Sequence, residues 1–413
     1  MSAFEASTPD GISRRAFVGV AMAAPLAAHA AMAGAAKEHV VVVGAGAFGG
    51  WSALALLRAG ARVTLVDAWG AGHSAASSGG ETRLIRGVYN GVLAYTQMAA
   101  RALVLWREAE QQWGRQVLFR TGALFMCAGD DGYVRRSIEP MKEVGLPLQQ
   151  LTLDEAARRF PQFDLRDART VYFEPEAGFL TARAACELVR DTFVREGGEY
   201  RRALVLPPSA GAAGPRLASI RLADGTTLAA DRFVFACGAW MGRLFPDVIG
   251  RRIVATRQEV FFFRTPPGDT RYDTGAMPAW VHLGEQLVYG VPNHERRGLK
   301  IADDTAGEEV DPTTLERVPS ERGLANARAI LRARFPAMAD APLLEARVCQ
   351  YEASSDGHFL VDRHPQFANA WLVGGGSGHG FKMGPALGEH VAALVQDRAQ
   401  VHPMFAWARL KPR

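Results

Sequence analysis

The sequence predicts an α/β protein: a Rossmann-type domain assembled from discontinuous segments, with an inserted α+β domain built on a mixed sheet. Three observations support this. The chain of 413 residues is long enough for two domains. An apolar, β-branched run near the N-terminus enters a glycine-rich turn, and a second strand-like run enters another glycine-rich turn more than 320 residues later. Between them lie an amphipathic helical stretch, residues 95–113, and strand-like pieces at 123–127 and 259–263, which indicate a second core.

Composition excludes several classes of protein. Hydrophobic residues make up 48% and charged residues 22%, as in an ordinary globular chain rather than a disordered or fibrous one. The net charge is only +4 and no long basic run occurs, so we expect no nucleic-acid partner. The four cysteines form no CxxC pair and no HExxH motif occurs, so we predict neither a disulfide scaffold nor a metal site.

Residues 1–36 are predicted to be a twin-arginine signal peptide. Arg14 and Arg15 directly precede a stretch to Ala36 that has no charged side chain and ends in small-residue triplets. We therefore expect the twin-arginine export machinery to deliver the protein to the periplasm or another extracytoplasmic space. An uncleaved membrane anchor is the alternative, because about 20 apolar residues can span a bilayer. The stretch is rich in Ala and Gly and contains Pro25, so we expect no stable membrane insertion after cleavage.

The first glycine-rich turn follows the run at residues 40–43, which is apolar enough for a central parallel strand. A helical stretch and a second strand come next, and that strand ends at Asp67. This order is the dinucleotide-binding fingerprint. Gly44 permits the tight turn, Gly46 leaves room for a pyrophosphate, and Gly49 lets helix and strand approach. Asp67 would accept hydrogen bonds from the adenosine ribose.

The second glycine-rich turn follows a strand-like run at residues 370–373 and has five glycines in seven positions. Gly376, Gly378 and Gly380 are its predicted cofactor-binding residues. A nicotinamide enzyme needs one such turn per cofactor, so two turns indicate a longer dinucleotide such as FAD, with the second turn at the flavin end. A plain connection between a strand and a helix is the alternative interpretation.

A third stretch, residues 230–240, is a predicted strand that ends in a small-residue turn containing Gly238. It resembles the middle motif of flavoproteins with two dinucleotide-binding motifs. The three stretches together predict how the chain is divided. We assign the FAD-binding domain to residues 37–89, 166–245 and 346–413, and the substrate-binding domain to residues 90–165 and 246–345.

Four motifs in this order resemble the monomeric sarcosine oxidase and N-methyltryptophan oxidase family, a branch of the D-amino-acid-oxidase-like FAD-dependent oxidoreductases. They lie at residues 76–89, 348–351, 356–362 and 376–382. The resemblance covers essentially the whole chain after residue 38. It implies an FAD-dependent oxidase of an amino acid or N-substituted amino acid. Such an enzyme transfers a hydride from the carbon next to nitrogen, releases an imine and reduces molecular oxygen to hydrogen peroxide.

The resemblance also implies roles near the flavin. Cys349 matches the cysteine that binds the flavin through a thioether, although a cysteine in an apolar strand is by itself more often a core residue. Lys300 matches the lysine that assists electron transfer to oxygen; a solvated surface lysine is the alternative interpretation. Arg83, next to Thr82 in the same cofactor motif, matches the basic residue beside the flavin ring. The other three cysteines lack such a context and are expected to be structural.

Other matches imply a substrate pocket. Arg86 and Lys382 match the pair that binds a substrate carboxylate, for which a planar guanidinium and a point-charge ammonium are well suited. Tyr289 and Tyr351 match tyrosines that line the pocket, and we count Tyr351 with Lys300 and Arg83 as catalytic.

Two positions depart from the family pattern. Asp304 stands where the family has a histidine that contacts the substrate, so we count Asp304 as a substrate-binding residue. Gly79 stands where the family has a second histidine. We therefore expect the fold and the flavin chemistry to carry over, but not sarcosine as substrate. Two alternatives stay open: a dehydrogenase of the same fold that passes electrons to a quinone or carrier protein, and a flavin- or nucleotide-binding protein without turnover.

Overall fold

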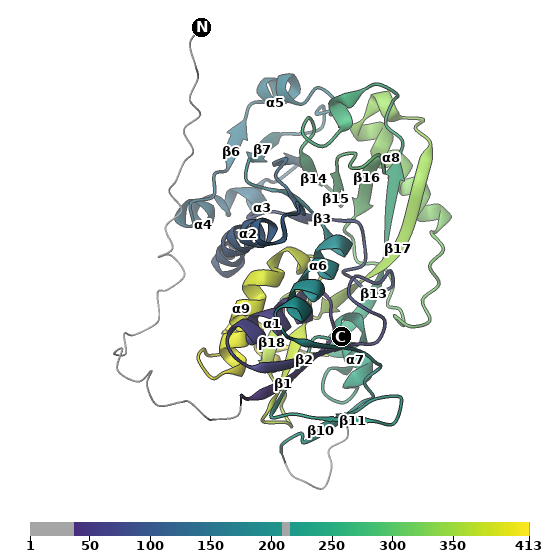
Figure 1. The fold of residues 1–413 in the computed structure, drawn as a ribbon. Helices are drawn as coiled ribbons and strands as arrows, with labels where there is room; N and C mark the ends of the chain where they lie inside the picture. The colour runs from purple at the N-terminus through teal and green to yellow at the C-terminus, as the bar shows by residue number, and fades with distance from the viewer. Residues whose placement is uncertain (1–36, 209–214, 413) are drawn as a thin grey trace.

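The computed structural model describes residues 37–208 and 215–412, so the predicted export signal lies outside the described residues. Two large sheets organise this part of the chain, a six-stranded sheet in the lower half of Figure 1 and an eight-stranded sheet in the upper half. Among the helices described, none combines the length and the apolar character needed to cross a membrane.

The six-stranded sheet is the predicted Rossmann-type sheet. Its strands, in spatial order, are β18 (Leu360–Arg363), β19 (Ala370–Gly374), β12 (Arg232–Phe235), β1 (His39–Val43), β2 (Arg62–Asp67) and β9 (Glu199–Arg202). Strand β1 pairs in parallel with both β12 and β2, while only β18 is antiparallel. All five residues of β1 are buried, as expected for an apolar strand in the middle of a parallel sheet.

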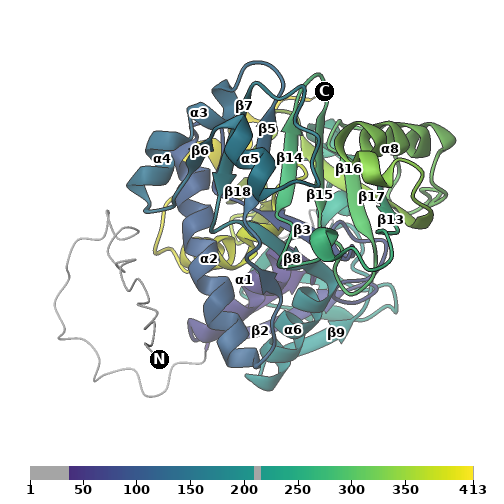
Figure 2. The same cartoon turned by 90° about the horizontal axis from the view of Figure 1, so that it is seen from above.

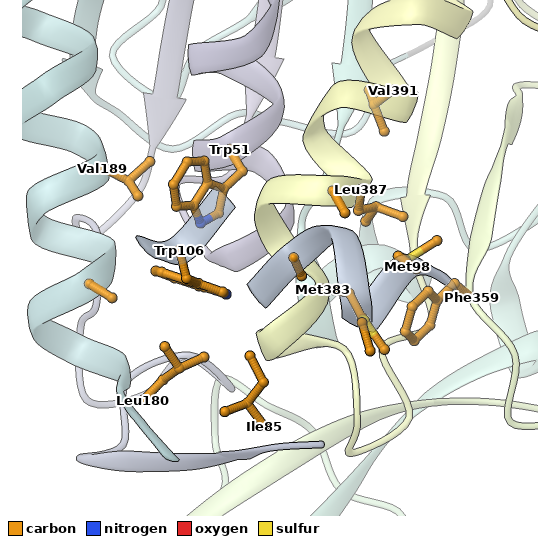
Figure 3. Packing of buried hydrophobic residues seen from close by; sticks show 14 of the residues in the cluster. Trp51, Ile85, Met98, Trp106, Leu180, Val189, Phe359, Met383, Leu387 and Val391 are labelled. Carbon is orange, nitrogen blue, oxygen red and sulfur yellow. The ribbon is translucent and has the colours of Figure 1, made fainter. Parts of the chain in front are cut away.

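Helices pack on one another beside this sheet. They are α1 (Ala47–Arg58), α2 (Leu93–Trp113), α6 (Ala182–Arg195) and α9 (Gly384–Val395). Figure 3 shows Trp51 of α1 and Trp106 of α2 in the core they share, with the ring centroids 5.1 Å apart. Helix α9 lies very close to α1, since a Cβ on Gly388 would come within 2.6 Å of the Trp51 carbonyl oxygen. Helix α1 begins at Ala47, directly after the glycine turn.

The eight-stranded sheet is mixed, as predicted. In spatial order its strands are β17 (Leu343–Ser354), β13 (Ile253–Phe263), β16 (Leu299–Asp303), β15 (Leu287–Val291), β14 (Ala279–Leu283), β5 (Ala123–Cys127), β7 (Thr170–Glu174) and β6 (Gln149–Leu151). Strands β14 and β5 pair in parallel, and the other pairs are antiparallel. Helix α8 (Glu321–Arg334) contacts β13 and β16. In Figure 2, which views the molecule from above, α8 lies beside these strands.

Smaller elements complete the fold. A three-stranded sheet consists of β3 (Thr82–Ile85), β8 (Gly178–Thr181) and β4 (Leu118–Phe119), and a hairpin consists of β10 (Ser219–Arg221) and β11 (Thr227–Ala229). The remaining α-helices are α3 (Gly132–Arg135), α4 (Ile138–Glu143), α5 (Leu153–Arg159) and α7 (Met241–Leu244).

Sheet membership differs from the predicted division of the chain at two places. Strand β7 belongs to the eight-stranded sheet although it follows the predicted boundary at residue 166, and β17 crosses the predicted boundary at residue 346. The physical reason for the second difference is continuous pairing: β17 pairs with β13 along its full length. Because β17 leads from the upper sheet toward the lower one, its last residues lie close to the cofactor sheet (Figure 1).

Candidate active site

A cavity of about 560 Å³ lies at the carboxyl ends of the parallel strands β1, β2, β12 and β19. Ligands bind at this edge in open α/β sheets. All three predicted cofactor stretches contribute to its wall. Its lining includes Gly44, Gly46, Asp67, Arg83, Cys237, Gly238, Tyr351, Glu352, Gly376, Gly378 and Gly380.

The first glycine turn forms a cradle that larger residues would fill. Gly44 has a φ of +103°, and a Cβ there would lie 2.2 Å from the Ala236 carbonyl oxygen. A Cβ on Gly49 would lie 1.8 Å from the Gly44 carbonyl oxygen. Gly46 lines the cavity and is the N-cap of α1, so unpaired backbone N–H groups of that helix face the same turn. These residues fit the pyrophosphate of a dinucleotide.

Asp67 both braces this turn and faces the cavity. Its Oδ2 accepts a hydrogen bond from the Ala45 N–H at 2.7 Å, and its Oδ1 accepts from the Trp69 and Gly70 N–H groups at 2.9 and 2.7 Å. Each carboxylate oxygen has more than one lone pair, so a ribose hydroxyl can still donate to it. Trp69 and Trp240, which the sequence analysis missed, line the same region with ring centroids 4.8 Å apart.

The residues predicted to face the flavin converge on Thr82. Arg83 donates hydrogen bonds to the carbonyl oxygens of Thr82 at 2.8 Å and Ser77 at 2.6 Å. Lys300 is only 2% exposed and donates from Nζ to the Thr82 carbonyl oxygen at 3.1 Å. Burial, with Arg83 as a second cause, lowers the pKa of Lys300 to about 7. The Thr82 hydroxyl is buried with no partner among the described residues, which leaves it available to a ligand.

The two half-buried cysteines occupy different positions. Cys349 lies on β17 two residues before Tyr351, so both side chains point to the same face of the strand, and Tyr351 lines the cavity. Cys237, which the sequence analysis expected to be structural, itself lines the cavity. Burial raises the pKa of the Cys237 thiol, and a protonated thiol is a poor nucleophile.

A second, smaller cavity of about 50 Å³ adjoins the first, and the two share Arg83, Gly378 and Phe381. The structure brings four of the predicted substrate residues together around it: Arg86, Tyr289, Asp304 and Lys382. They come from the segment after β3, from β15, from the residue after β16 and from the turn before α9.

Two cations, the half-buried Arg86 and the buried Lys382, contact the same tyrosine in this smaller cavity. The Arg86 guanidinium lies 4.6 Å from the centre of the Tyr89 ring and donates to the Val88 carbonyl oxygen and to the Tyr133 hydroxyl. Lys382 is 4% exposed and donates from Nζ to the Tyr89 hydroxyl at 2.8 Å. Burial and the nearby Arg86 hold the pKa of Lys382 well below its ordinary value. The pair is suited to a ligand that brings negative charge.

Asp304 contributes the opposite charge to this cavity. Its Oδ1 accepts a hydrogen bond from the Tyr351 hydroxyl at 2.6 Å. Its Oδ2 has no partner among the described residues and is not enclosed by protein atoms. Burial raises the pKa of both Asp304 and Tyr351. Asp304 therefore offers a free acceptor on the wall that also carries Tyr289, whose ring centre is 5.2 Å from Lys300 Nζ.

Several residues near the two cavities escaped the sequence analysis. Tyr89 ends the motif at residues 76–89 and Glu352 directly follows the motif at residues 348–351, so both could have been noticed, whereas Glu174 carries no sequence signal. Glu352 Oε1 is buried without a partner, in the cavity wall near Gly374. Within residues 37–208 and 215–412, no cluster of three or more His, Cys, Asp or Glu side chains could hold a metal ion.

Curated relatives cover nearly the whole chain. Monomeric sarcosine oxidase of Bacillus sp. (strain B-0618) is 30% identical over 382 residues, which are 90% of this chain and 96% of that protein. N-methyl-L-tryptophan oxidase of Yersinia pestis (strain Pestoides F) is 26% identical over 366 residues, 87% and 95% of the two chains.

Solved structures show the same fold. L-proline dehydrogenase from P. horikoshii has a TM-score of 0.77 at 21% identity, with 90% of this chain and 97% of that chain covered. A modified fructosyl peptide oxidase from Aspergillus nidulans has a TM-score of 0.79 at 20% identity, with 90% and 94% covered. The model of the family described as FAD dependent oxidoreductase (DAO) matches residues 39–394. With the glycine cradle and the cavity it borders, these matches show that the chain belongs to the DAO family of FAD-dependent oxidoreductases, in the branch of monomeric sarcosine oxidase.

Proposed function

We propose that the protein is an oxidase of a small amino acid or N-substituted amino acid. The observation that carries this proposal is the pair of cations, Arg86 and Lys382, in a small cavity that shares a wall with the cofactor cavity. Two cations in a buried site repel one another unless an anion joins them, so a carboxylate substrate relieves an unfavourable arrangement. The curated relatives named above are oxidases of N-methylated amino acids, which agrees with this assignment.

The other polar groups of the small cavity would recognise the nitrogen. Asp304 has one oxygen held by Tyr351 and one free, and a substrate N–H can donate to the free oxygen. The substrate is then held at both ends, with the carboxylate at Arg86 and Lys382 and the amine at Asp304. The small cavity has a volume of only about 50 Å³ and adjoins the cofactor cavity, which favours a small amino acid that extends from one into the other.

Bound FAD supplies the acceptor for the hydride that leaves the carbon next to nitrogen. The protein orients that carbon, excludes water and stabilises the charge that develops during the reaction. The Asp304 carboxylate, which accepts a hydrogen bond from Tyr351, is a proton acceptor beside the substrate nitrogen. That nitrogen must be neutral for the hydride to leave. Arg83 lines both cavities and Lys300 lies nearby at the Thr82 carbonyl oxygen, so positive charge there favours negative charge that develops between the cavities.

We propose that oxygen is the electron acceptor and hydrogen peroxide the product, because Lys300 is a buried cation beside the cofactor cavity. We further propose that Cys349 binds the flavin covalently, since it shares a strand face with the cavity-lining Tyr351. Export to the periplasm by the twin-arginine machinery rests on the sequence of residues 1–36 alone.

A substrate screen with the purified flavoprotein tests the proposal. Without oxygen, small amino acids and their N-methyl derivatives should bleach the flavin absorbance near 450 nm, and the matching amines without a carboxylate should not. On addition of air, peroxide should appear in a one-to-one ratio to substrate consumed. Bleaching without peroxide would favour a dehydrogenase that uses a quinone or carrier protein. No bleaching by any member of the screen would exclude amino-acid oxidation.

A further inference from the structure

Glu174, at the end of β7, is a buried carboxylate that the proposed reaction leaves without a role. Its side chain is 0% exposed. One oxygen, Oε1, accepts a hydrogen bond from the Gly87 N–H at 2.6 Å, while Oε2 is buried and has no partner among the described residues. An unpaired carboxylate oxygen in a protein interior is costly, so its presence calls for an explanation.

The surroundings of Glu174 connect it to the two cations. Gly87 directly follows Arg86, so the hydrogen bond from its N–H fixes the backbone that carries the guanidinium. A Cβ on Gly87 would lie 3.2 Å from Glu174 Oε1 and 2.6 Å from a methyl group of Leu146, which explains why this close approach uses glycine. The same segment continues to Tyr89, whose hydroxyl accepts the hydrogen bond from Lys382.

The charged and titratable groups that face Glu174 come from two segments. Arg86 and Tyr89 lie on the segment after β3 and Lys382 in the turn before α9, while Tyr133 on α3 acts through its interactions with Arg86 and Tyr89. Among the described residues Glu174 forms no salt bridge, so its charge acts on Arg86 and Lys382 at longer range. Burial raises the pKa of Glu174 to about 7, while Arg86 and Lys382 oppose that rise.

We propose that Glu174 is a positioning residue that holds the Arg86 segment in place and supplies the exchangeable negative charge which the substrate carboxylate replaces. In the empty site an ionised Glu174 partly balances Arg86 and Lys382. When a carboxylate binds, it is a second anion beside the same two cations, so Glu174 takes up a proton from solvent and becomes neutral. The carboxylate and the proton that Glu174 takes up enter the site together, so the net charge of the site does not change. This inference rests on the proposed function, because it requires the cations to bind a carboxylate.

The pH dependence follows from this exchange. Below pH 7 Glu174 is already protonated and does not compete with the ligand. Above pH 7 the ligand must displace a bound charge, so its affinity falls by up to tenfold per pH unit. Asp304 and Lys300 also titrate near the small cavity, and Lys382 loses its own charge at high pH. The part of the pH dependence that is due to Glu174 is therefore measured by comparing the wild type with Glu174→Gln.

The experiment measures acetate binding to the holoenzyme by titration calorimetry at pH 6 and pH 8, with acetamide as the uncharged isostere. In Glu174→Gln the neutral amide keeps an oxygen for the Gly87 N–H but cannot ionise. We expect the affinity of the variant relative to wild type to improve by about tenfold between pH 6 and pH 8. Glu176→Gln is the matched control: Glu176 pairs with Arg107 and Arg120 outside the cavity, and its substitution should change neither affinity nor pH dependence.

The outcomes separate the two proposals. A purely structural Glu174 would give an affinity ratio that is the same at both pH values, which would overturn the inference. Wild-type protein that binds acetate no better than acetamide would instead overturn the carboxylate site and the proposed function with it. If Glu174→Gln does not fold, wild-type titrations at pH 7 in two buffers of different ionisation enthalpy count the protons taken up. Uptake is expected, and zero uptake refutes the exchange.

Discussion

Replacing Arg86 with alanine is the sharpest test of how the substrate is held. The guanidinium lies over the Tyr89 ring and donates to the Val88 carbonyl oxygen and the Tyr133 hydroxyl, so its planar group is fixed before a ligand arrives. Removing it leaves Lys382 and Arg83 as the lysine and arginine side chains in the described wall of the small cavity, and Arg83 is already engaged with the Thr82 and Ser77 carbonyl oxygens. Because Arg86 is one cause of the low pKa of Lys382, its removal lets Lys382 hold its proton more firmly and compensates in part.

The magnitude follows from the contact that is lost. A buried, charge-assisted pair with a carboxylate is worth about 2–4 kcal/mol, which corresponds to roughly 30- to 1000-fold in affinity. Compensation by Lys382 places the expected loss toward the lower half of that range, at about 100-fold. A neutral amine that lacks the carboxylate never made this contact, so its affinity should change by less than about threefold.

Anaerobic stopped-flow reduction of the flavin measures both effects, because it gives an apparent Kd and a limiting rate for each ligand. Each amino acid is compared with its decarboxylated amine, and Arg135→Ala serves as control because Arg135 is an exposed arginine of α3 that pairs with Asp131. We expect the apparent Kd of the amino acid to rise and the limiting rate to change little. Equal weakening of acid and amine, or a wild-type enzyme that reduces both equally well, would refute the carboxylate site.

The remaining predictions concern other parts of the chain. The rate at which oxygen reoxidises the reduced enzyme should fall as pH rises through about 7, because Lys300 loses its proton there, and Lys300→Met should be slow and nearly independent of pH; a wild-type rate that is flat across this range contradicts the assigned role. Acid-precipitated wild type should stay yellow and Cys349→Ala should release the flavin, whereas Cys237→Ala should retain it; colourless wild-type precipitate rules out covalent attachment. Gly44→Ala should purify without flavin, since its Cβ would meet the Ala236 carbonyl oxygen at 2.2 Å, and a full flavin content measured by absorbance would show that the turn can adapt. Replacing Arg14 and Arg15 with lysine should leave the precursor in the cytoplasm, as fractionation and immunoblotting would show; normal delivery would mean that the signal was misread.

Local sequence signals predicted the elements that depend on local physics. The apolar run at β1 and the glycines that follow it predict a buried parallel strand and a turn, because few other residues tolerate those positions. The mixed sheet was also expected from its strand-like pieces. The boundaries near residues 166 and 346 could not be read from the sequence, because strand pairing between distant segments decides which sheet receives β7 and β17.

The candidate site was likewise predicted from the sequence only in part. Arg86, Lys382 and Asp304 were found because they sit in or beside recognisable motifs, and the structure places all three around one small cavity. Glu174 could not be found this way, and Glu352 was missed although it directly follows the motif at residues 348–351. The environment of each glutamate is created by residues from distant segments, such as Gly87 for Glu174 and Gly374 for Glu352.

Strand β17 explains how one short stretch can line the cofactor cavity and also hold Asp304 of the small cavity. Successive side chains alternate between the faces of a strand, so Cys349 and Tyr351 share one face while Glu352 points to the other, toward Gly374. A slip of one residue would exchange these faces and place Glu352 where Tyr351 now donates to Asp304. Pairing with β13 along its whole length fixes the register against such a slip. The long ladder therefore holds the chemistry in place while single pocket positions, such as Asp304, remain free to change the substrate.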